Sequence, residues 1–324
     1  MPQPPAAAPA TRPTGPCSAA QWQQIRQAVL AEARRACVAG SFLPLVGPLG
    51  EAVDYVAMPL LLAPGTDGVG GFSVDDTGSW RLATLQTEVW LRDAQLADPR
   101  LASALLAFRR AAQVLARLAD DLIFNGQLGP DQGPAAGAGP SAGQPDGDAG
   151  VPPWQVRGGQ ASAGLLPAPM PMLMPMPAGE PARRAGEPRD RAALGESLVG
   201  RVSRAIGRLE ADYHLGPFAC VLDPIFYTAV QSPDRHSMRL AQDRILPLLA
   251  GGPLLRSSSL APRSGVVVAL GGAPIDLVVG TDTAVEFVQQ TEQAWYVFRV
   301  FAKGVLRIKQ ASAVQALGLA ARPG

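Results

Sequence analysis

The longest regular pattern of apolar positions lies between residues 98 and 126. These positions recur at alternating spacings of four and three residues, which places them on one stripe of a helix: Leu101, Leu105, Phe108, Ala112, Leu115, Ala119 and Leu122. We expect Asp98 to cap this helix, Pro99 to occupy its first position and Asn125-Gly126 to end it. At about 1.5 Å per residue the helix is roughly 39 Å long, which is typical of a structural spine.

A second amphipathic helix is predicted from Ser18 to about Cys37. Ser18 and Gln21 have the spacing of a capping box. Apolar residues follow at spacings of three and four, so they share one face: Trp22, Ile25 and Val29. The glycines and prolines of SFLPLVGPLG, residues 41–50, then predict a turn.

The remaining patterned segments are mixed. Residues 81–91 partly alternate and predict a strand, and a helical pattern resumes near Leu194. After residue 217, FACVLD predicts a strand, and PIFYTAVQ and SMRLAQDRILPLLAGG predict helices. Further strands are expected at LLRSSSL, GVVVAL, IDLVV, AVEFVQ, AWYVFRVFA and VLRIK.

Residues 129–192 differ in composition from the rest of the chain. They hold 12 Gly and 13 Pro in 64 residues, far above the ordinary share of about 12%, so we expect no packed element there. PMPMLMPMP, residues 169–177, contains four of the seven methionines. It is a Cu(I) site, an apolar docking strip or a proline-stiffened loop. The absence of nearby Cys or His disfavours the Cu(I) site, and the loop is the favoured interpretation.

Composition narrows the function. A net charge of +1 lacks the basic excess of a nucleic-acid-binding protein. No run of about 18 apolar residues predicts a membrane span, and the N-terminus has no apolar signal-peptide core. Three widely spaced cysteines without a CxxC indicate a reducing cytoplasm and no disulfides. Apolar surroundings predict that Cys37 and Cys220 are inert thiols.

We find no catalytic or metal-binding motif in the sequence. His214 and His236, the two histidines, have no Cys, Asp or Glu at metal spacing, so we expect ordinary surface or loop histidines. Asp120 and Asp121 are adjacent on the spine helix and are expected to be surface charges rather than an acid–base pair. We therefore expect no enzyme activity, no cofactor and no metal.

Several separated segments resemble the encapsulins, bacterial nanocompartment shell proteins once called linocins. They are QWQQI and GPLG in the first block, LADDLIFNG, LGPFACVLDPIFY, SGVVVALGGAPIDLVVGTDTAVEF and FRVFAKGVLRIKQASAVQAL. They follow the family's order and cover roughly 18–126 and 194–318. The resemblance implies an α+β chain with the tailed-phage major capsid fold of the Hong Kong phage type. That fold has a peripheral domain, a spine helix, an extended loop and an axial domain.

With this fold in view, the expected organisation has six parts. They are a disordered tail (1–17), the N-terminal helix and turn (18–50), an extended-loop region (51–97), the spine helix (98–126), a Gly/Pro-rich insertion (127–192), and the rest of the peripheral domain with the axial domain (193–324). The loop around residues 65–85 is shorter than is usual in the family, which bears on shell size. A prophage major capsid protein is the alternative function. An enzyme in its own right is a third, disfavoured by the missing nucleophile–base pairs.

The resemblance also implies a function and partners. Encapsulins self-assemble into icosahedral shells in the cytoplasm and enclose a cargo enzyme, a peroxidase or a ferritin-like iron oxidase, without nucleic-acid or membrane partners. The cargo docks by a short apolar C-terminal peptide beside the N-terminal helix. The family's basic residue and aspartate in the following turn match Gly40 and Pro44 here, so we expect apolar docking residues: Trp22, Ile25, Val29, Leu43 and Leu45.

The resemblance implies a pore site as well. The family's axial loop, matched here by SPDRHS, lines the fivefold opening of the shell. Its expected pore residues are Asp234, Arg235 and His236.

Overall fold

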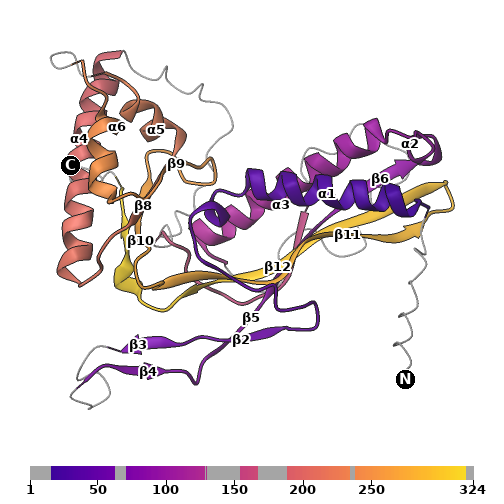
Figure 1. The fold of residues 1–324 in the computed structure, drawn as a ribbon, viewed down its shortest axis with the longest axis horizontal. Coiled ribbons are helices and arrows are strands. Elements are labelled where there is room, and N and C mark those ends of the chain that lie inside the picture. The colour runs from indigo at the N-terminus through magenta and orange to yellow at the C-terminus, as the bar shows by residue number, and fades with distance from the viewer. Residues whose placement is uncertain are drawn as a thin grey trace, which may run out of the picture.

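The computed structural model describes residues 16–62, 71–127, 129, 154–166, 188–233 and 238–318. These residues form two joined bodies, each with its own sheet and helices, and an arm that projects from one of them (Figure 1). Each body is centred on its own cluster of buried apolar side chains, and the cluster of the second body also includes residues at the ends of α3, β11 and β12.

The first body is a five-stranded sheet with helices on one face. Its strands lie in the order β1 (Leu45–Val46), β11 (Ile275–Gln290), β12 (Trp295–Ile308), β6 (Ala83–Arg92) and β7 (Trp154–Gly158). The helices are α1 (Ala19–Ala36), α2 (Asp93–Leu96) and α3 (Ala102–Asn125). Helices α1 and α3 run side by side on the sheet (Figure 1). Phe298 of β12 packs edge-on against Trp22 of α1 and Phe108 of α3, with ring centroids 5.7 and 5.3 Å apart.

The second body is a four-stranded sheet covered by helices. The strand order is β13 (Val314–Ala316), β10 (Gly265–Ala269), β8 (Phe218–Leu222) and β9 (Leu254–Arg256). The helices are α4 (Pro188–Ala211), α5 (Pro224–Val230) and α6 (Ala241–Ile245), and 3-10 turns cover Ala39–Ser41, Leu246–Leu249 and Ala311–Ala313. Every residue of β8 and β10 is buried, so these two strands form the centre of the body.

The arm consists of two short ribbons that follow one another. In one ribbon β2 (Tyr55–Ala57) pairs with β5 (Ser79–Arg81), and in the other β3 (Leu60–Leu62) pairs with β4 (Ser73–Asp75). Figure 1 shows the arm extending away from the first body. Its base is tied to β12, because Lys303 forms an ion pair with Asp54 at 2.6 Å.

The predicted first helix and the predicted end of the spine helix are confirmed. The Ser18 side chain accepts a hydrogen bond from the Gln21 N–H, and the Gln21 side chain accepts one from the Ser18 N–H. Helix α3 ends at Asn125, and Gly126 follows with φ +83°, a conformation that suits glycine.

The predicted start of the spine helix is wrong by about three residues. Asp98 does accept hydrogen bonds, from the N–H groups of Arg100 and Ala102 at 2.9 and 3.0 Å. Ala102 is the first residue of the helix, so Asp98 does bond to the helix start. It does so across a turn that ends at Leu101 in a left-handed conformation, not from the position directly before the helix. Leu101 is fully buried, so this turn directs an apolar side chain into the core.

Four of the predicted strands merge in pairs into two long strands, β11 and β12. IDLVV and AVEFVQ belong to β11, and AWYVFRVFA and VLRIK belong to β12. Gly280 and Gly304 lie within these strands and do not end them. Glycine is present at both positions because atoms of adjacent residues leave no room for a Cβ. A Cβ would be 2.9 Å from a Leu82 methyl group at Gly280 and 2.8 Å from the Val278 carbonyl oxygen at Gly304. By contrast, the helix predicted for SMRLAQDRILPLLAGG shrinks to α6 and a 3-10 turn, and the strand predicted for LLRSSSL is only Leu254–Arg256.

The expectation that the Gly/Pro-rich segment holds no packed element is wrong in three places, one of which is the start of helix α4 at Pro188. Strand β7 pairs with β6 and buries Val156. Leu165 and Leu166 are also buried, and their N–H groups donate to the carbonyls of Ile123 and Phe124. These short stretches have too few residues to outweigh the surrounding composition in a sequence pattern. PMPMLMPMP lies outside the described residues.

Candidate functional site

A mainly apolar cleft of about 590 Å³ lies between the second half of α3 and the middle of the five-stranded sheet. From α3 it is lined by Leu115, Ala119 and Leu122, and from the sheet by residues that include Leu85, Leu277 and Leu306. The burial of the apolar positions along α3 shows why the cleft is apolar. Its first five members are buried, whereas Ala119 and Leu122 are only partly buried because they face this space.

The rim of the cleft is polar. Arg34 of α1 forms an ion pair with Asp282 of β11 at 2.7 Å, and the buried Lys303 also lines the cleft. The hydroxyl oxygen of Thr281, which also lines the cleft, is buried and has no hydrogen-bond partner among the described residues. An apolar floor with a few polar groups at its edge is the usual make-up of a ligand or peptide site.

The structure separates the five predicted docking residues. Trp22, Ile25 and Val29 are at most 6% exposed, because that face of α1 attaches the helix to α3 and the sheet. Leu43 is also buried, in the core of the second body. Only Leu45 is exposed, at 58%, and it lines the cleft.

The expected groove over α1 is therefore wrong. A spacing of three and four shows that a helix face is apolar, but it does not show what covers that face. The part that α3, β11 and β12 play in the cleft has no signal in the sequence pattern, because these elements meet only in the folded chain. A basic residue and an aspartate do meet beside it, but they are Arg34 and Asp282, not residues at the turn positions 40 and 44.

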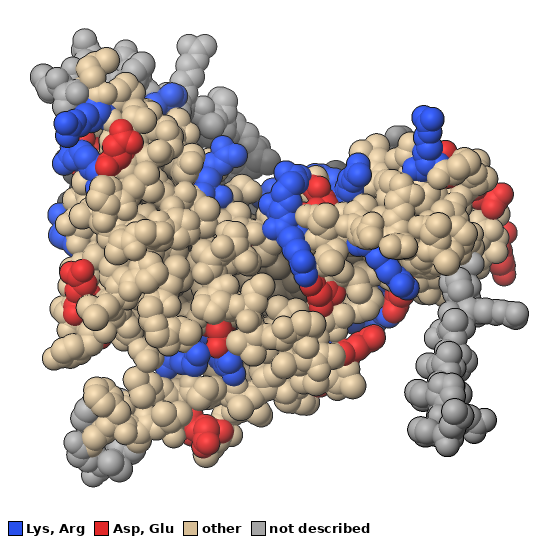
Figure 2. Space-filling view, in the orientation of Figure 1, with Lys and Arg blue, Asp and Glu red and all other residues tan. Residues whose placement is uncertain are grey.

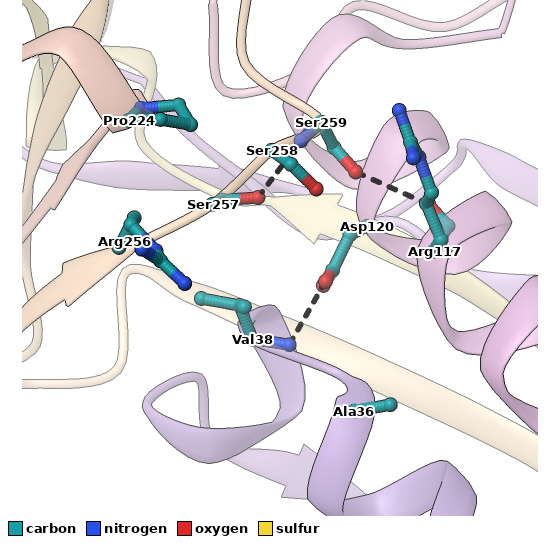
Figure 3. Close-up of a pocket in the computed structure, with 9 residues that line it drawn as sticks. All are labelled: Ala36, Val38, Arg117, Asp120, Pro224, Arg256, Ser257, Ser258 and Ser259. Atoms are coloured by element: carbon teal, nitrogen blue, oxygen red, sulfur yellow. Dashed lines mark hydrogen bonds between the residues drawn. The ribbon is translucent and has the colours of Figure 1, made fainter.

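Asp120 holds the turn that follows α1. Its carboxylate accepts a hydrogen bond from the Val38 N–H at 2.9 Å (Figure 3). It also accepts one from the Ala39 N–H at 2.8 Å and lies 3.5 Å from the Cys37 sulfur. Asp120 is 3% exposed, so its expected place on the helix surface is wrong, whereas Asp121 is exposed. Burial raises the pKa of the Asp120 carboxyl, and the two N–H groups oppose that shift.

The remaining candidates take little part in a site. Asp234, Arg235 and His236 lie outside the described residues. His214 is buried rather than at the surface, with its Nε2 2.8 Å from the Ser312 hydroxyl, and burial lowers its pKa. Within the described ranges, no three His, Cys, Asp or Glu side chains cluster closely enough to hold a metal. No described helix combines the length and apolar character needed to cross a bilayer.

Comparison with solved structures defines the fold class. The chain matches the virus-like particle from Pyrococcus furiosus with a TM-score of 0.59 and 14% identity, over 92% of this chain and 99% of that one. It matches the capsid of Myoviridae phage XM1 with a TM-score of 0.50 and 15% identity, over 85% and 90% of the two chains. The predicted α+β fold of tailed-phage capsids is confirmed.

Sequence comparison then defines the family. The model of the family described as encapsulating protein for peroxidase matches residues 10–131 and 185–300, and the chain belongs to this family. A curated relative, the type 1 encapsulin shell protein EncA of Myxococcus xanthus (strain DK1622), is 24% identical over 313 residues, 91% of each chain. The resemblance to encapsulins is confirmed, and such shell proteins are structural rather than catalytic.

Proposed function

We propose that this chain assembles with copies of itself into a closed, icosahedral shell in the cytoplasm, and that the shell encloses a cargo enzyme. The family to which it belongs supports this function. The arm is the observation that carries it, because an isolated two-stranded ribbon is marginally stable in water.

The arm exposes apolar side chains that its own chain does not cover. Phe72 and Val74 are 74% and 57% exposed, and Tyr55, Leu60 and Leu61 are between 38% and 61% exposed. Leu61 lies directly opposite Val74 across the β3–β4 ribbon. Apolar surface gathered on a projecting element is typical of a contact with another molecule. In a shell built from one chain, that molecule is a neighbouring copy.

Electron microscopy of the purified protein tests this function, together with a charge placed on the arm. Val74→Asp should leave the subunit folded but prevent closed particles, whereas Ser79→Asp adds the same charge at an exposed polar position of the arm and should assemble. Normal particles from Val74→Asp would exclude the arm as an assembly contact. A parent protein that remains monomeric would contradict the shell function itself.

The cleft is the proposed cargo-docking site. A short apolar peptide at the C-terminus of the cargo would place its side chains against Leu45, Leu122 and Leu277, with Arg34 and Asp282 at the rim. Each apolar side chain buried contributes about 1.5–3 kcal/mol before ordering costs are subtracted, so one peptide would bind weakly. Many copies of the site in one shell would compensate through multivalency. The family description favours a peroxidase as cargo, with a ferritin-like iron oxidase as the other candidate.

A further inference from the structure

A second hollow, of about 360 Å³, lies where the two bodies meet. We call it the waist pocket and define it by six of its lining residues: Arg117, Asp120, Arg256, Ser257, Ser258 and Ser259. Its walls come from α3 of the first body and from the end of β9 and the segment after it in the second (Figure 3). Figure 2 shows Lys and Arg side chains along the waist between the two bodies, with Asp and Glu side chains beside some of them. Unlike the apolar cleft, this pocket is lined mainly by polar and charged groups.

Two cations stand on opposite sides of the pocket. Arg117 and Arg256 are both exposed, and their side chains flank the serines in Figure 3. Neither guanidinium forms an ion pair with any residue that the structure describes, whereas Arg34, Arg35, Arg244, Arg299 and Arg307 all do. Arg256 also lies over the Tyr227 ring, 6.0 Å from its centroid, which restricts the position of its charge.

The three serines between the arginines belong to an anchored segment. The Ser259 hydroxyl donates to the Arg117 carbonyl at 3.3 Å, and the Asn125 side chain donates to the Ser259 carbonyl at 2.9 Å. The Ser257 hydroxyl accepts a hydrogen bond from the Ser259 N–H at 3.2 Å, so its own proton is free to point into the pocket. The Ser258 side chain is exposed and forms no hydrogen bond among the described residues.

Asp120 also lines the pocket, and its negative charge opposes the positive charges of the two arginines. The Asp120 carboxylate is directed towards the N–H groups of Val38 and Ala39, away from the serines (Figure 3). Among the residues that line the pocket, two guanidinium groups and one carboxylate give a net charge of +1. Burial also raises the pKa of Asp120, which weakens its opposing charge on acidification.

We propose that the waist pocket binds a phosphate group, supplied either as inorganic phosphate or as the phosphoryl group of a small metabolite. Guanidinium groups match the geometry of phosphate oxygens and form strong charge-assisted hydrogen bonds with them. The hydroxyls of Ser257 and Ser258 add donors for the remaining oxygens, since the Ser259 hydroxyl already donates to the Arg117 carbonyl. Because its ligands come from both bodies, the bound anion connects α3 to the segment after β9 and stabilises the junction.

Thermal unfolding of the purified full-length protein tests this site. Inorganic phosphate, pyrophosphate and glycerol phosphate are titrated separately, with sodium chloride at matched ionic strength as the salt control. Phosphate should raise the unfolding temperature, and Arg117→Gln or Arg256→Gln should each weaken its apparent affinity about tenfold or more. Arg204→Gln, which removes an exposed arginine of α4, should leave the response unchanged.

The three ligands distinguish the source of the phosphoryl group. A response to all three indicates a site for free phosphate, and a response to glycerol phosphate alone indicates a site for a phosphorylated metabolite. Equal responses to phosphate and chloride, or equal responses in all three arginine variants, would overturn the proposal. A structure of the particle with a carboxylate of a neighbouring copy between Arg117 and Arg256 would overturn it as well. Because the titration does not need closed particles, its outcome is independent of the proposed shell function.

Discussion

The carboxylate of Asp120 accepts a hydrogen bond from the N–H of Ala39 at 2.8 Å, across 81 residues of sequence. This bond joins the C-terminal part of the spine helix to the turn after α1. This turn is followed by β1, and Leu45 of β1 lines the apolar cleft. Asp120 therefore connects the spine helix, the proposed cargo-docking cleft and the waist pocket.

Asp120→Ala should destabilise the subunit by about 2–3 kcal/mol. The partly buried Val38 N–H and the buried Ala39 N–H would both lose their hydrogen-bond acceptor. Asp120→Asn retains one acceptor oxygen and should cost less. Asp121→Ala, at the exposed neighbouring position, is the control and should change stability by less than about 1 kcal/mol. Chemical denaturation followed by tryptophan fluorescence gives these values. Equal losses at the two positions would show that the turn does not depend on Asp120.

Leu45→Asp should empty the shells of co-expressed cargo without preventing assembly. The substitution removes an exposed apolar side chain from the cleft and adds a charge where the peptide would bury apolar groups. The peptide should bind at least about tenfold more weakly, which corresponds to losing one apolar contact.

Leu49→Asp is the matched control for this variant. Leu49 is 42% exposed in the same turn, but it is not among the residues that line the cleft. Cargo content is measured by gel electrophoresis of purified particles. Full loading of the Leu45→Asp particles would place the docking site elsewhere. Leu43 is not a suitable target, because a charge at this buried position would unfold the second body.

A buried ion cluster should make the stability of the first body sensitive to acid. Asp276 of β11 is 2% exposed and contacts Arg307 through two oxygens at 2.7 Å and Lys309 at 3.0 Å. Burial acts to raise the pKa of Asp276, but hydrogen bonds from Arg307 and Lys309 outweigh it and hold the pKa below its ordinary value of 3.8. A lowered folded-state pKa stabilises the protein above pH 3.8, and this contribution disappears as the pH falls through the folded-state pKa.

Asp276→Asn should therefore cost about 3 kcal/mol near neutral pH, because two partly buried cations lose their partner. The difference from the parent protein should shrink below pH 3.8. Asp282→Asn, which breaks an exposed ion pair with Arg34, should cost about 1 kcal/mol or less. Unfolding midpoints measured across the pH range check this. A pH-independent difference would show that the charge of Asp276 is not the cause.

Cys37 and Cys220 should resist alkylation in the folded protein. Burial raises the pKa of each thiol to about 12, and at Cys37 the nearby Asp120 carboxylate adds to the effect. Few thiolates then exist at neutral pH, and Cys220 is also fully buried. Mass spectrometry after iodoacetamide treatment, with and without denaturant, measures the modification. Rapid labelling of Cys220 under native conditions would reveal local opening of β8.

Several local features follow directly from the sequence. Ser18 and Gln21 form their capping box with each other, and Gly126 ends α3, because both depend only on residues within one turn. The apolar stripe of α3 was also predictable, because helical periodicity repeats over its whole length. The order of the resembling segments identified the family, and with it the capsid fold.

Only the tertiary structure decided which partner each apolar or charged position meets. Asp120 and Asp121 are identical in kind, and the orientation of α3 against α1 alone buries one and exposes the other. Trp22 and Leu45 are likewise both apolar, but Trp22 is buried in the core and Leu45 is exposed. An apolar side chain can be buried either by its own chain or by a bound peptide, and the sequence does not distinguish the two. A sequence pattern records the periodicity with which side chains emerge from one element. The distances between elements, and therefore the cleft and the waist pocket, arise only when separate segments pack together.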